Sequence, residues 1–281
     1  MTKWAMVIDI SKCIACYNCF IACKDEFWNN DYYPYSAGIQ KHGQNLITLI
    51  KREGGKYPVV KVVYMPIMCM HCDDPPCVKA AKNNAVYKRD DGIVIIDPEK
   101  AKGQKQIVEA CPYHVITWNE EKQLPQICTF CVHRLVKGLL PKCVEACPSG
   151  ALMFGDLDDP NSEVSKIVKS GKAEVFHPEY GTRPNVYYLN LHLMTKCFIV
   201  GSVAFKDTDE CAENVKVTLV SNEGKELMTT NTDFFGTFKF EGLSPGQEYT
   251  IKLEYPGYKE KEIKVKLEED TYLGYIFLEK V

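Results

Sequence analysis

The chain has 281 residues, of which 46% are hydrophobic and 25% charged, and its formal net charge is −3. This composition is close to that of ordinary globular proteins and excludes disordered and collagen-like chains. The near balance of charges gives no general attraction to nucleic acid or to an anionic membrane. The longest uncharged apolar stretch, Cys197–Phe205, is too short to span a bilayer. No export signal opens the sequence, so we expect a cytoplasmic protein.

A short strand is expected over Trp4–Asp9, and a dense cysteine run follows it. The run has the spacing C-x2-C-x2-C-x3-C and consists of Cys13, Cys16, Cys19 and Cys23. This spacing is typical of proteins with two [4Fe–4S] clusters. In such proteins the first three cysteines bind one cluster and the fourth binds the other.

An insertion over residues 24–68 separates this run from the next cysteines, and it contains the aromatic stretch Tyr32, Tyr33, Pro34 and Tyr35. We expect the aromatic stretch to be a packing surface that faces a partner. Gly54 and Gly55, like Gly242 further on, are interpreted as turns.

Looser cysteine groups follow the insertion. They comprise Cys69, Cys72 and Cys77; a lone Cys111 after an expected strand at Gly92–Asp97; and Cys128, Cys131, Cys143 and Cys147. Zinc is the competing metal because C-x2-C pairs also build zinc sites, but zinc sites take two pairs and the first run does not divide that way. Disulfides are weaker still, since reducing compartments keep thiols free.

The remainder of the chain changes pattern. Residues 161–195 are interpreted as a connector with a short helix over Glu163–Ser170, and residues 196–281 show apolar residues at every second position between glycine-containing turns. Short strands at this spacing predict a β-sandwich or barrel. Cys197 and Cys211, 14 residues apart in this segment, are interpreted as structural thiols.

An internal repeat links the cysteine groups. A shift of 88 residues places Cys23 on Cys111, and a shift of 66 places Cys77 on Cys143. Four positions of the repeat then lack their cysteine: Ala81, Ala101, Gln104 and Ile107.

If the fourth cysteine of each group binds the partnered cluster, the twelve cysteines form three complete [4Fe–4S] sites. Cluster 1 takes Cys13, Cys16, Cys19 and Cys147; cluster 2 takes Cys23, Cys128, Cys131 and Cys143; cluster 3 takes Cys69, Cys72, Cys77 and Cys111. The four emptied positions are those of a fourth site. His71, His114 and His133 lie near ligand cysteines and are either donors to cluster sulfur or ordinary residues of the loops.

Two nested pairs of such groups resemble the iron–sulfur subunits of the dimethyl-sulfoxide-reductase family of molybdopterin enzymes, over residues 4–160. Within this family, the loss of one cluster and the β-rich extension resemble most the small subunits of transhydroxylases that act on polyhydroxylated aromatics. The stretches that carry this narrower resemblance are Cys69–Cys72, Asp91–Gly103, Cys111–Tyr113, Trp118–Glu121 and Asn231–Phe240.

The resemblance implies an α+β fold with two nested ferredoxin-like modules in residues 1–160, followed by a β domain similar to prealbumin-like and carboxypeptidase-regulatory-like domains. It also implies a heterodimer, whose large subunit holds molybdenum on two molybdopterin guanine dinucleotides and binds the substrate. In respiratory members, the cluster site that corresponds to the missing one lies at the end of the row of clusters, next to a membrane subunit. Its loss in this chain argues against a membrane partner.

Three functions are consistent with these features. The first is a non-catalytic electron-transfer subunit of a molybdenum transhydroxylase. The second is the same role in a related reductase, dehydroxylase or hydroxylase, and the third is a free-standing polyferredoxin. Sequence alone leaves open the substrate, the cluster potentials and the direction of electron flow.

Overall fold

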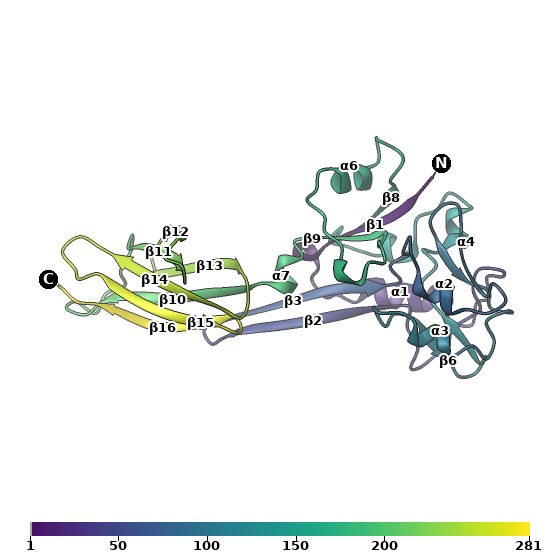
Figure 1. Ribbon diagram of the computed structural model, residues 1–281, viewed down its shortest axis with the longest axis horizontal. Helices are drawn as coiled ribbons and strands as arrows, with labels where there is room; N and C mark the ends of the chain where they lie inside the picture. Colours follow the sequence, from purple (N-terminus) through teal and green to yellow (C-terminus); the bar gives the residue numbers. More distant parts are fainter. Residues whose placement is uncertain (1) are drawn as a thin grey trace. The chain divides into compact units, whose positions relative to one another are not determined.

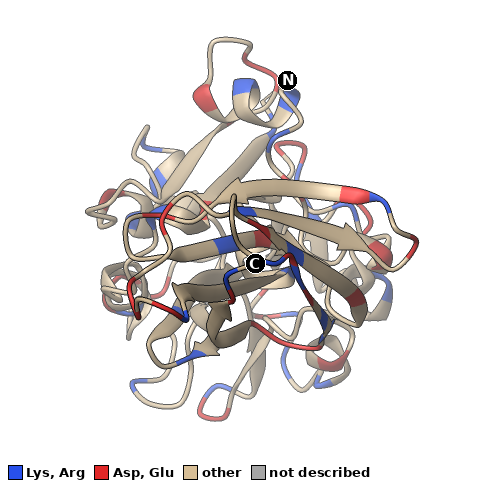
Figure 2. Ribbon diagram, turned by 90° about the vertical axis from the view of Figure 1, so that its left-hand side faces the viewer, with Lys and Arg blue, Asp and Glu red and all other residues tan. Residues whose placement is uncertain are grey.

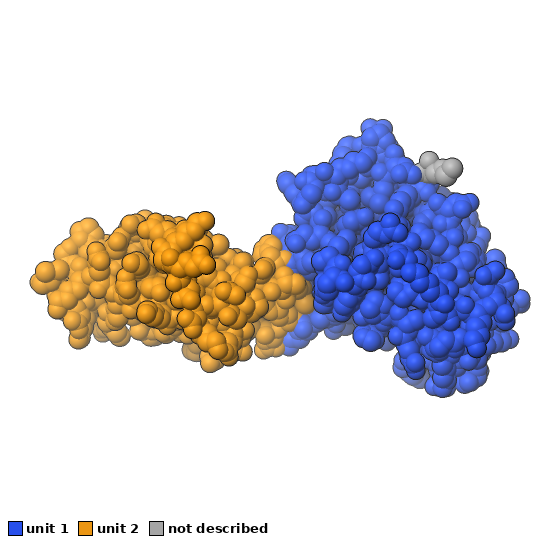
Figure 3. Space-filling model, viewed as in Figure 1, with its two compact units in different colours: residues 1–51, 64–191 blue, residues 52–63, 192–281 orange. Residues whose placement is uncertain are grey.

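The computed structural model describes residues 2–281, and the chain divides into two compact units. Unit 1 comprises residues 1–51 and 64–191, and unit 2 comprises residues 52–63 and 192–281 (Figure 3). The division therefore cuts through the insertion, whose central part belongs with the C-terminal strands. The expected α+β class with a separate all-β domain is confirmed.

The elements in chain order are β1 (Trp4–Asp9), η1 (Ile10–Lys12), α1 (Asn18–Phe27), β2 (Ile47–Lys56), β3 (Val59–Met68), α2 (Pro76–Ala80), β4 (Val86–Lys88), β5 (Val94–Ile96), α3 (Gln106–Glu109), β6 (Thr117–Asn119), β7 (Leu124–Gln126), α4 (Val132–Leu135), α5 (Lys142–Glu145), β8 (Leu152–Asp156), α6 (Glu163–Lys169), η2 (Pro178–Tyr180), β9 (Val186–Leu189), α7 (His192–Thr195), β10 (Cys197–Phe205), β11 (Lys216–Ser221), β12 (Glu226–Asn231), β13 (Thr237–Leu243), β14 (Gln247–Glu254), β15 (Lys261–Leu267) and β16 (Thr271–Leu278).

Unit 1 is organised around β1, the middle strand of a three-stranded sheet in the order β8-β1-β9. It runs antiparallel to β8 and parallel to β9 (Figure 1). Five of its six residues are buried, which is why its sequence is almost continuously apolar and lacks the alternation of a half-exposed strand. Helix α6 covers this sheet, with Val164 packed against Ala5 and Val7.

The expected connector over 161–195 is largely part of unit 1. Its helix α6 packs on β1, and β9 supplies an edge of the same sheet, whereas α7 at its end belongs to unit 2. In the described part of the chain, no helix has both the length and the apolarity needed to cross a membrane.

Unit 2 is a β-sandwich. One sheet has the order β13-β10-β16 and the other β12-β11-β14-β15 (Figure 1). The alternating apolar residues of both sheets meet in one core, as the period-two pattern predicts. Fully buried members of this core include Ile199, Val217, Leu219, Ile251 and Leu253.

The outward faces of the strands in unit 2 carry charges of both signs, interspersed rather than segregated (Figure 2). Several form exposed pairs across neighbouring strands, such as Lys216–Glu254 at 2.6 Å and Lys252–Glu262 at 2.8 Å. Pairs of this kind contribute little to stability. Their effect is to keep the sandwich surface polar and close to neutral.

The hairpin β2–β3 contradicts the interpretation of Gly54 and Gly55 as a turn, because both lie inside β2. Gly54 is required by a close approach: a Cβ there would lie 1.8 Å from Oδ2 of Asp270. Gly242 is likewise inside a strand, β13, where its φ of +77° accompanies a shift of register against β10.

Arg52 explains why the middle of the insertion belongs to unit 2. Its guanidinium pairs with Asp270 at 3.0 Å and donates to the carbonyl oxygens of Leu193, at 2.9 Å, and Lys196. The carboxylate of Asp270 is 3% exposed, and its Oδ1 accepts the backbone N–H of Phe198 at 2.9 Å. A buried carboxylate is thus neutralised by a cation from another part of the sequence.

Replacing Arg52 by Met is expected to destabilise unit 2 by about 3 kcal/mol, because Asp270 is left charged and buried without its cation. Hydrogen exchange of the β10 and β16 amides measures the effect. Lys61→Met is the matched control, since it breaks a more exposed pair of the same hairpin with Glu241 and should cost less than about 1 kcal/mol. Equal costs for the two variants would contradict the assignment.

Candidate iron–sulfur centres

The structure brings the twelve cysteines of residues 13–147 together in three groups of four. The first set, Cys13, Cys16, Cys19 and Cys147, lines one cavity. The third set, Cys69, Cys72, Cys77 and Cys111, lines another. In the second set, Cys23 interacts electrostatically with Cys128, Cys131 and Cys143. These are the groupings predicted for clusters 1, 3 and 2.

Helix geometry divides the cysteines of one run between two sets. Cys19 and Cys23 lie one turn apart on the same buried face of α1. Cys19 faces the first set and Cys23 the second. Helix α5, which packs against α1, does the reverse: Cys143 belongs to the second set, and Cys147, just past the helix end, belongs to the first.

Three of the four C-x2-C loops bend in the same way, and the fourth, Cys16–Cys19, differs because its left-handed residue is Tyr17. In the three, the residue before the second cysteine has a left-handed backbone, with φ of 54° at Ala15, 46° at His71 and 49° at Phe130. In each loop the N–H of this residue donates to the sulfur of the first cysteine, Cys13, Cys69 or Cys128. The loops therefore present amide donors to the sulfurs, an arrangement suited to an anionic group.

Burial dominates the chemistry of these thiols. It raises the pKa of Cys19 and Cys128 to about 11 and that of Cys77 and Cys131 to about 12, with neighbouring cysteines adding to the rise at Cys19, Cys77 and Cys131. Cys147 differs: burial acts to raise its pKa, but hydrogen bonds from Ser149 and from backbone amides lower it overall. The unligated thiols are thus mostly protonated at neutral pH, and metal binding must displace those protons.

A cationic side chain supports the loop of the third set. Lys88 donates to the carbonyl oxygens of His71, at 3.1 Å, and Cys72, at 2.8 Å, and pairs with Asp73 at 3.2 Å. Burial acts to raise the pKa of Asp73, but hydrogen bonds from Lys3, Asn185 and Lys88 lower it to about 2. The loop is therefore held by a charged network as well as by its apolar neighbours.

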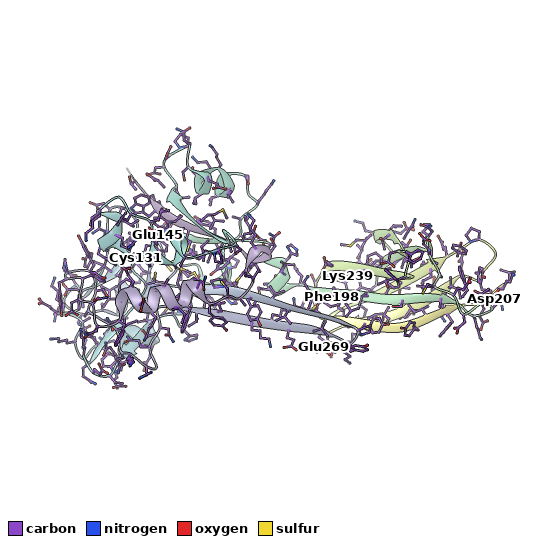
Figure 4. All side chains as sticks on the ribbon, turned by 180° about the vertical axis from the view of Figure 1, so that it is seen from behind. Cys131, Glu145, Phe198, Asp207, Lys239 and Glu269 are labelled. Atoms are coloured by element: carbon purple, nitrogen blue, oxygen red, sulfur yellow. The ribbon has the colours of Figure 1, made fainter. Side chains whose placement is uncertain are left out.

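The expected aromatic packing surface in the insertion turns partly inward, beside the second set. Tyr32 stacks on His133, with ring centroids 3.6 Å apart, and its hydroxyl donates to the carbonyl oxygen of Glu26 at 3.0 Å. His133 and Glu26 are in contact at 2.9 Å. Arg134 joins Glu26 to Glu145, which is labelled near Cys131 in Figure 4.

Three of the four emptied positions, all except Ala81, hold buried side chains. Ala101 and Ile107 are fully buried. The amide of Gln104 accepts the N–H of Lys82 at 2.8 Å and donates to the carbonyl oxygen of Lys100 at 2.8 Å. It therefore ties together the two segments whose cysteines would have held a fourth cluster.

The three histidines and the two remaining cysteines differ in their exposure to solvent. His71 and His133 are buried, whereas His114 is exposed. Cys197 is buried, and its sulfur lies 3.5 Å from Arg52, while Cys211 is exposed. Lys88 and Asn185 are site residues that the sequence did not indicate, because nothing in their local sequence marks a tertiary contact.

The donor set fits [4Fe–4S] clusters. Among the described residues, no three ligand-type side chains converge on one point as they would around a single ion. A cubane accepts one thiolate at each of four irons, so its ligands surround a volume. The first and third sets surround such cavities, whose other walls are mainly apolar, including Leu49 and Pro66 at the first set and Val94 and Ile127 at the third.

Two family models match the chain: a 4Fe-4S dicluster domain over residues 60–157 and a carboxypeptidase regulatory-like domain over residues 199–275. The small subunit of pyrogallol hydroxytransferase from Pelobacter acidigallici is 40% identical over 99% of this chain and 100% of its own length. The chain belongs to the iron–sulfur subunits of the dimethyl-sulfoxide-reductase family of molybdenum enzymes.

Other members of this iron–sulfur subunit family match a smaller share of the chain. A tetrathionate reductase subunit from Salmonella typhimurium is 40% identical over 67% of this chain and 73% of its own length. The arsenate respiratory reductase iron–sulfur subunit of a Shewanella species is 35% identical over 66% of this chain and 96% of its own. As a family member, the chain is a subunit of an oxidoreductase and is not catalytic alone.

Proposed function

We propose that the chain carries three [4Fe–4S] clusters and transfers electrons to and from a large molybdopterin subunit that acts on polyhydroxylated aromatics. The observation that carries the proposal is the gathering of twelve cysteines into three complete sets, with the four positions of a fourth site filled by other residues. A cluster supplies one-electron exchange. The chain's own residues fix its position and exclude water.

The three sets follow one another through the protein. The first and second sets are neighbours because α1 and α5 each contribute to both. The second and third are neighbours because His71, in the loop of the third, contacts Phe130, in the loop of the second, with ring centroids 3.8 Å apart. We infer that the three clusters form a linear electron-transfer chain in which cluster 2 lies between clusters 1 and 3.

We propose that the catalytic subunit binds over the first set and exchanges electrons with cluster 1. Cys16 is exposed, whereas all eight cysteines of the second and third sets are buried. Around it, Ile14, Tyr17 and Ile21 are 68%, 45% and 59% exposed. Exposed apolar side chains grouped at a cofactor are typical of a surface that a partner covers.

We propose that cluster 3 is the last cluster of the electron-transfer chain. Gln104, Ala101 and Ile107 occupy the place where a further cluster would continue it. We therefore propose that no membrane subunit takes part. None of the fourteen cysteines is joined in a disulfide, as is usual for proteins of a reducing compartment, so the proposed location is the cytoplasm.

Cys111→Ser is expected to remove cluster 3 alone, because Cys111 contributes to the third set only. Iron content should fall from about 12 to about 8 atoms per chain after anaerobic purification, with two cluster signals retained by EPR. Cys211→Ser, at an exposed thiol outside the sets, is the control and should leave the iron unchanged. Loss of all clusters in the Cys111 variant would disprove the ligand assignment.

Ile21→Glu is expected to weaken binding of the molybdenum subunit at least tenfold, about 1.4 kcal/mol, because it places a charge in the proposed apolar contact. Surface plasmon resonance with the purified partner measures the affinity, and iron analysis confirms that the clusters remain. The matched control is Leu227→Glu, at an exposed apolar residue of unit 2. Equal affinity of both variants and the native chain would exclude this face as the contact.

The relatives also favour a second candidate, a reductase, since two of them are named as reductase subunits. Those two match about two thirds of the chain, whereas the pyrogallol hydroxytransferase subunit matches unit 2 as well. The transhydroxylase type is therefore preferred.

Given pyrogallol and a second polyhydroxylated aromatic as the hydroxyl donor, the purified complex is expected to form product with no external electron donor, because moving a hydroxyl group from one ring to the other involves no net redox change. Product formation under anaerobic conditions, followed by chromatography with and without a reduced viologen dye, measures this. Strict dependence of turnover on the dye would establish the reductase instead. A chain that purifies alone, with no molybdenum-containing partner, would indicate a free-standing polyferredoxin.

A further inference from the structure

His71 is a fully buried histidine in the loop between two ligand cysteines of the third set. It is 0% exposed, and it has a left-handed backbone with φ of 46°. The same loop position is Ala15 at the first set and Phe130 at the second. The backbone therefore does not demand a histidine, and an apolar residue serves in both sister loops.

The hydrogen bonding of the ring fixes its tautomer. The backbone N–H of Val94 in β5 donates to Nδ1 of His71 at 3.1 Å, so Nδ1 is an acceptor and the neutral ring carries its proton on Nε2. Nε2 is buried and has no hydrogen-bond partner among the described residues. A buried N–H donor without an acceptor is costly, and native structures rarely keep one.

The surroundings of the ring limit what the missing acceptor can be. The ring lies against that of Phe130, which sits between Cys128 and Cys131 of the second set. Val94, which anchors the ring, also lines the cavity of the third set. The ring thus lies between the loops of the second and third sets. The polar side chains that bind His71, Lys88 at 3.1 Å and Asn185 at 2.7 Å, donate to its backbone carbonyl oxygen and not to the ring.

We propose that Nε2–H of His71 donates a hydrogen bond to a sulfur of one of the two clusters that flank it, cluster 2 or cluster 3. This inference rests on the proposed function, since it requires the clusters to be present. A reduced cluster carries more negative charge than an oxidised one, so an N–H donor stabilises the reduced form and raises the potential of the cluster that accepts it. His71 acts as a positioning and tuning residue, and it does not ligate iron.

The test is His71→Phe in the full chain, which keeps a flat ring beside Phe130 and removes the donor. In anaerobic potentiometric titrations followed by EPR, we expect the midpoint potential of one flanking cluster to shift downward while cluster 1 is unchanged. The identity of the shifted cluster tells which one accepts the bond. His71→Gln, which restores an N–H donor, is expected to return part of the shift.

His114→Phe is the matched control, because His114 also has a left-handed backbone, with φ of 53°, beside the third set but is exposed. It should leave all three potentials unchanged. If His71→Phe loses iron, the native chain decides the question: pulsed EPR of protein with ¹⁵N-labelled histidine should show nitrogen and exchangeable-proton couplings at one flanking cluster.

Unchanged potentials in an iron-replete His71→Phe variant, or the absence of any histidine coupling in the native chain, would overturn the proposal. Failure of the proposed function is separable from this outcome. It would appear as fewer than three clusters in the native chain, before any variant is measured.

Discussion

The arrangement of the first and second cysteine sets depends on the one helical turn that separates Cys19 from Cys23. Four residues of α-helix rise about 6 Å, so the two sulfurs contribute to neighbouring sets instead of the same one. Neither the first nor the second set is complete until α5 packs against α1. For the proposed clusters, binding and tertiary folding are therefore coupled, because ligation stabilises the fold that positions the ligands.

The inner cysteine groups keep a similar helix packing although they complete only one set of four. Helices α2 and α3 are in contact as α1 and α5 are, and the repeat positions 81, 101, 104 and 107 do not hold cysteine. Gln104 joins the two segments by hydrogen bonds to the backbone of Lys82 and Lys100. A side-chain amide can bridge two loops because it has both donors and an acceptor.

The cysteine sets could be predicted from sequence because ligand spacing is local and because the repeats reveal which group partners which. The strands of unit 2 could be predicted because alternation records burial on one face. The role of the insertion could not. Its decisive contact, Arg52 with Asp270, joins residues 218 positions apart, and an arginine in a polar strand gives no sign of a buried partner. The place of Gly54 inside a strand was unpredictable for the same reason, since its cause is the carboxylate that lies against it.

The unpaired N–H donor of His71 could not be predicted from the sequence for a related reason. The sequence places three histidines near ligand cysteines, but only the fold shows that His114 is exposed while His71 is enclosed and held by Val94. A structural histidine is therefore distinguished from one that tunes a cofactor by the hydrogen-bond partner of each ring nitrogen.

The hairpin tip has a consequence for protein engineering. Residues 52–63, from the first third of the chain, belong to unit 2 and supply the counter-ion of Asp270. The C-terminal domain therefore cannot be exchanged by a cut at a single junction. A chimaera that grafts residues 192–281 onto a shorter relative would bury Asp270 with no counter-ion. Exchange of the domain between proteins of this family must carry both pieces of chain together.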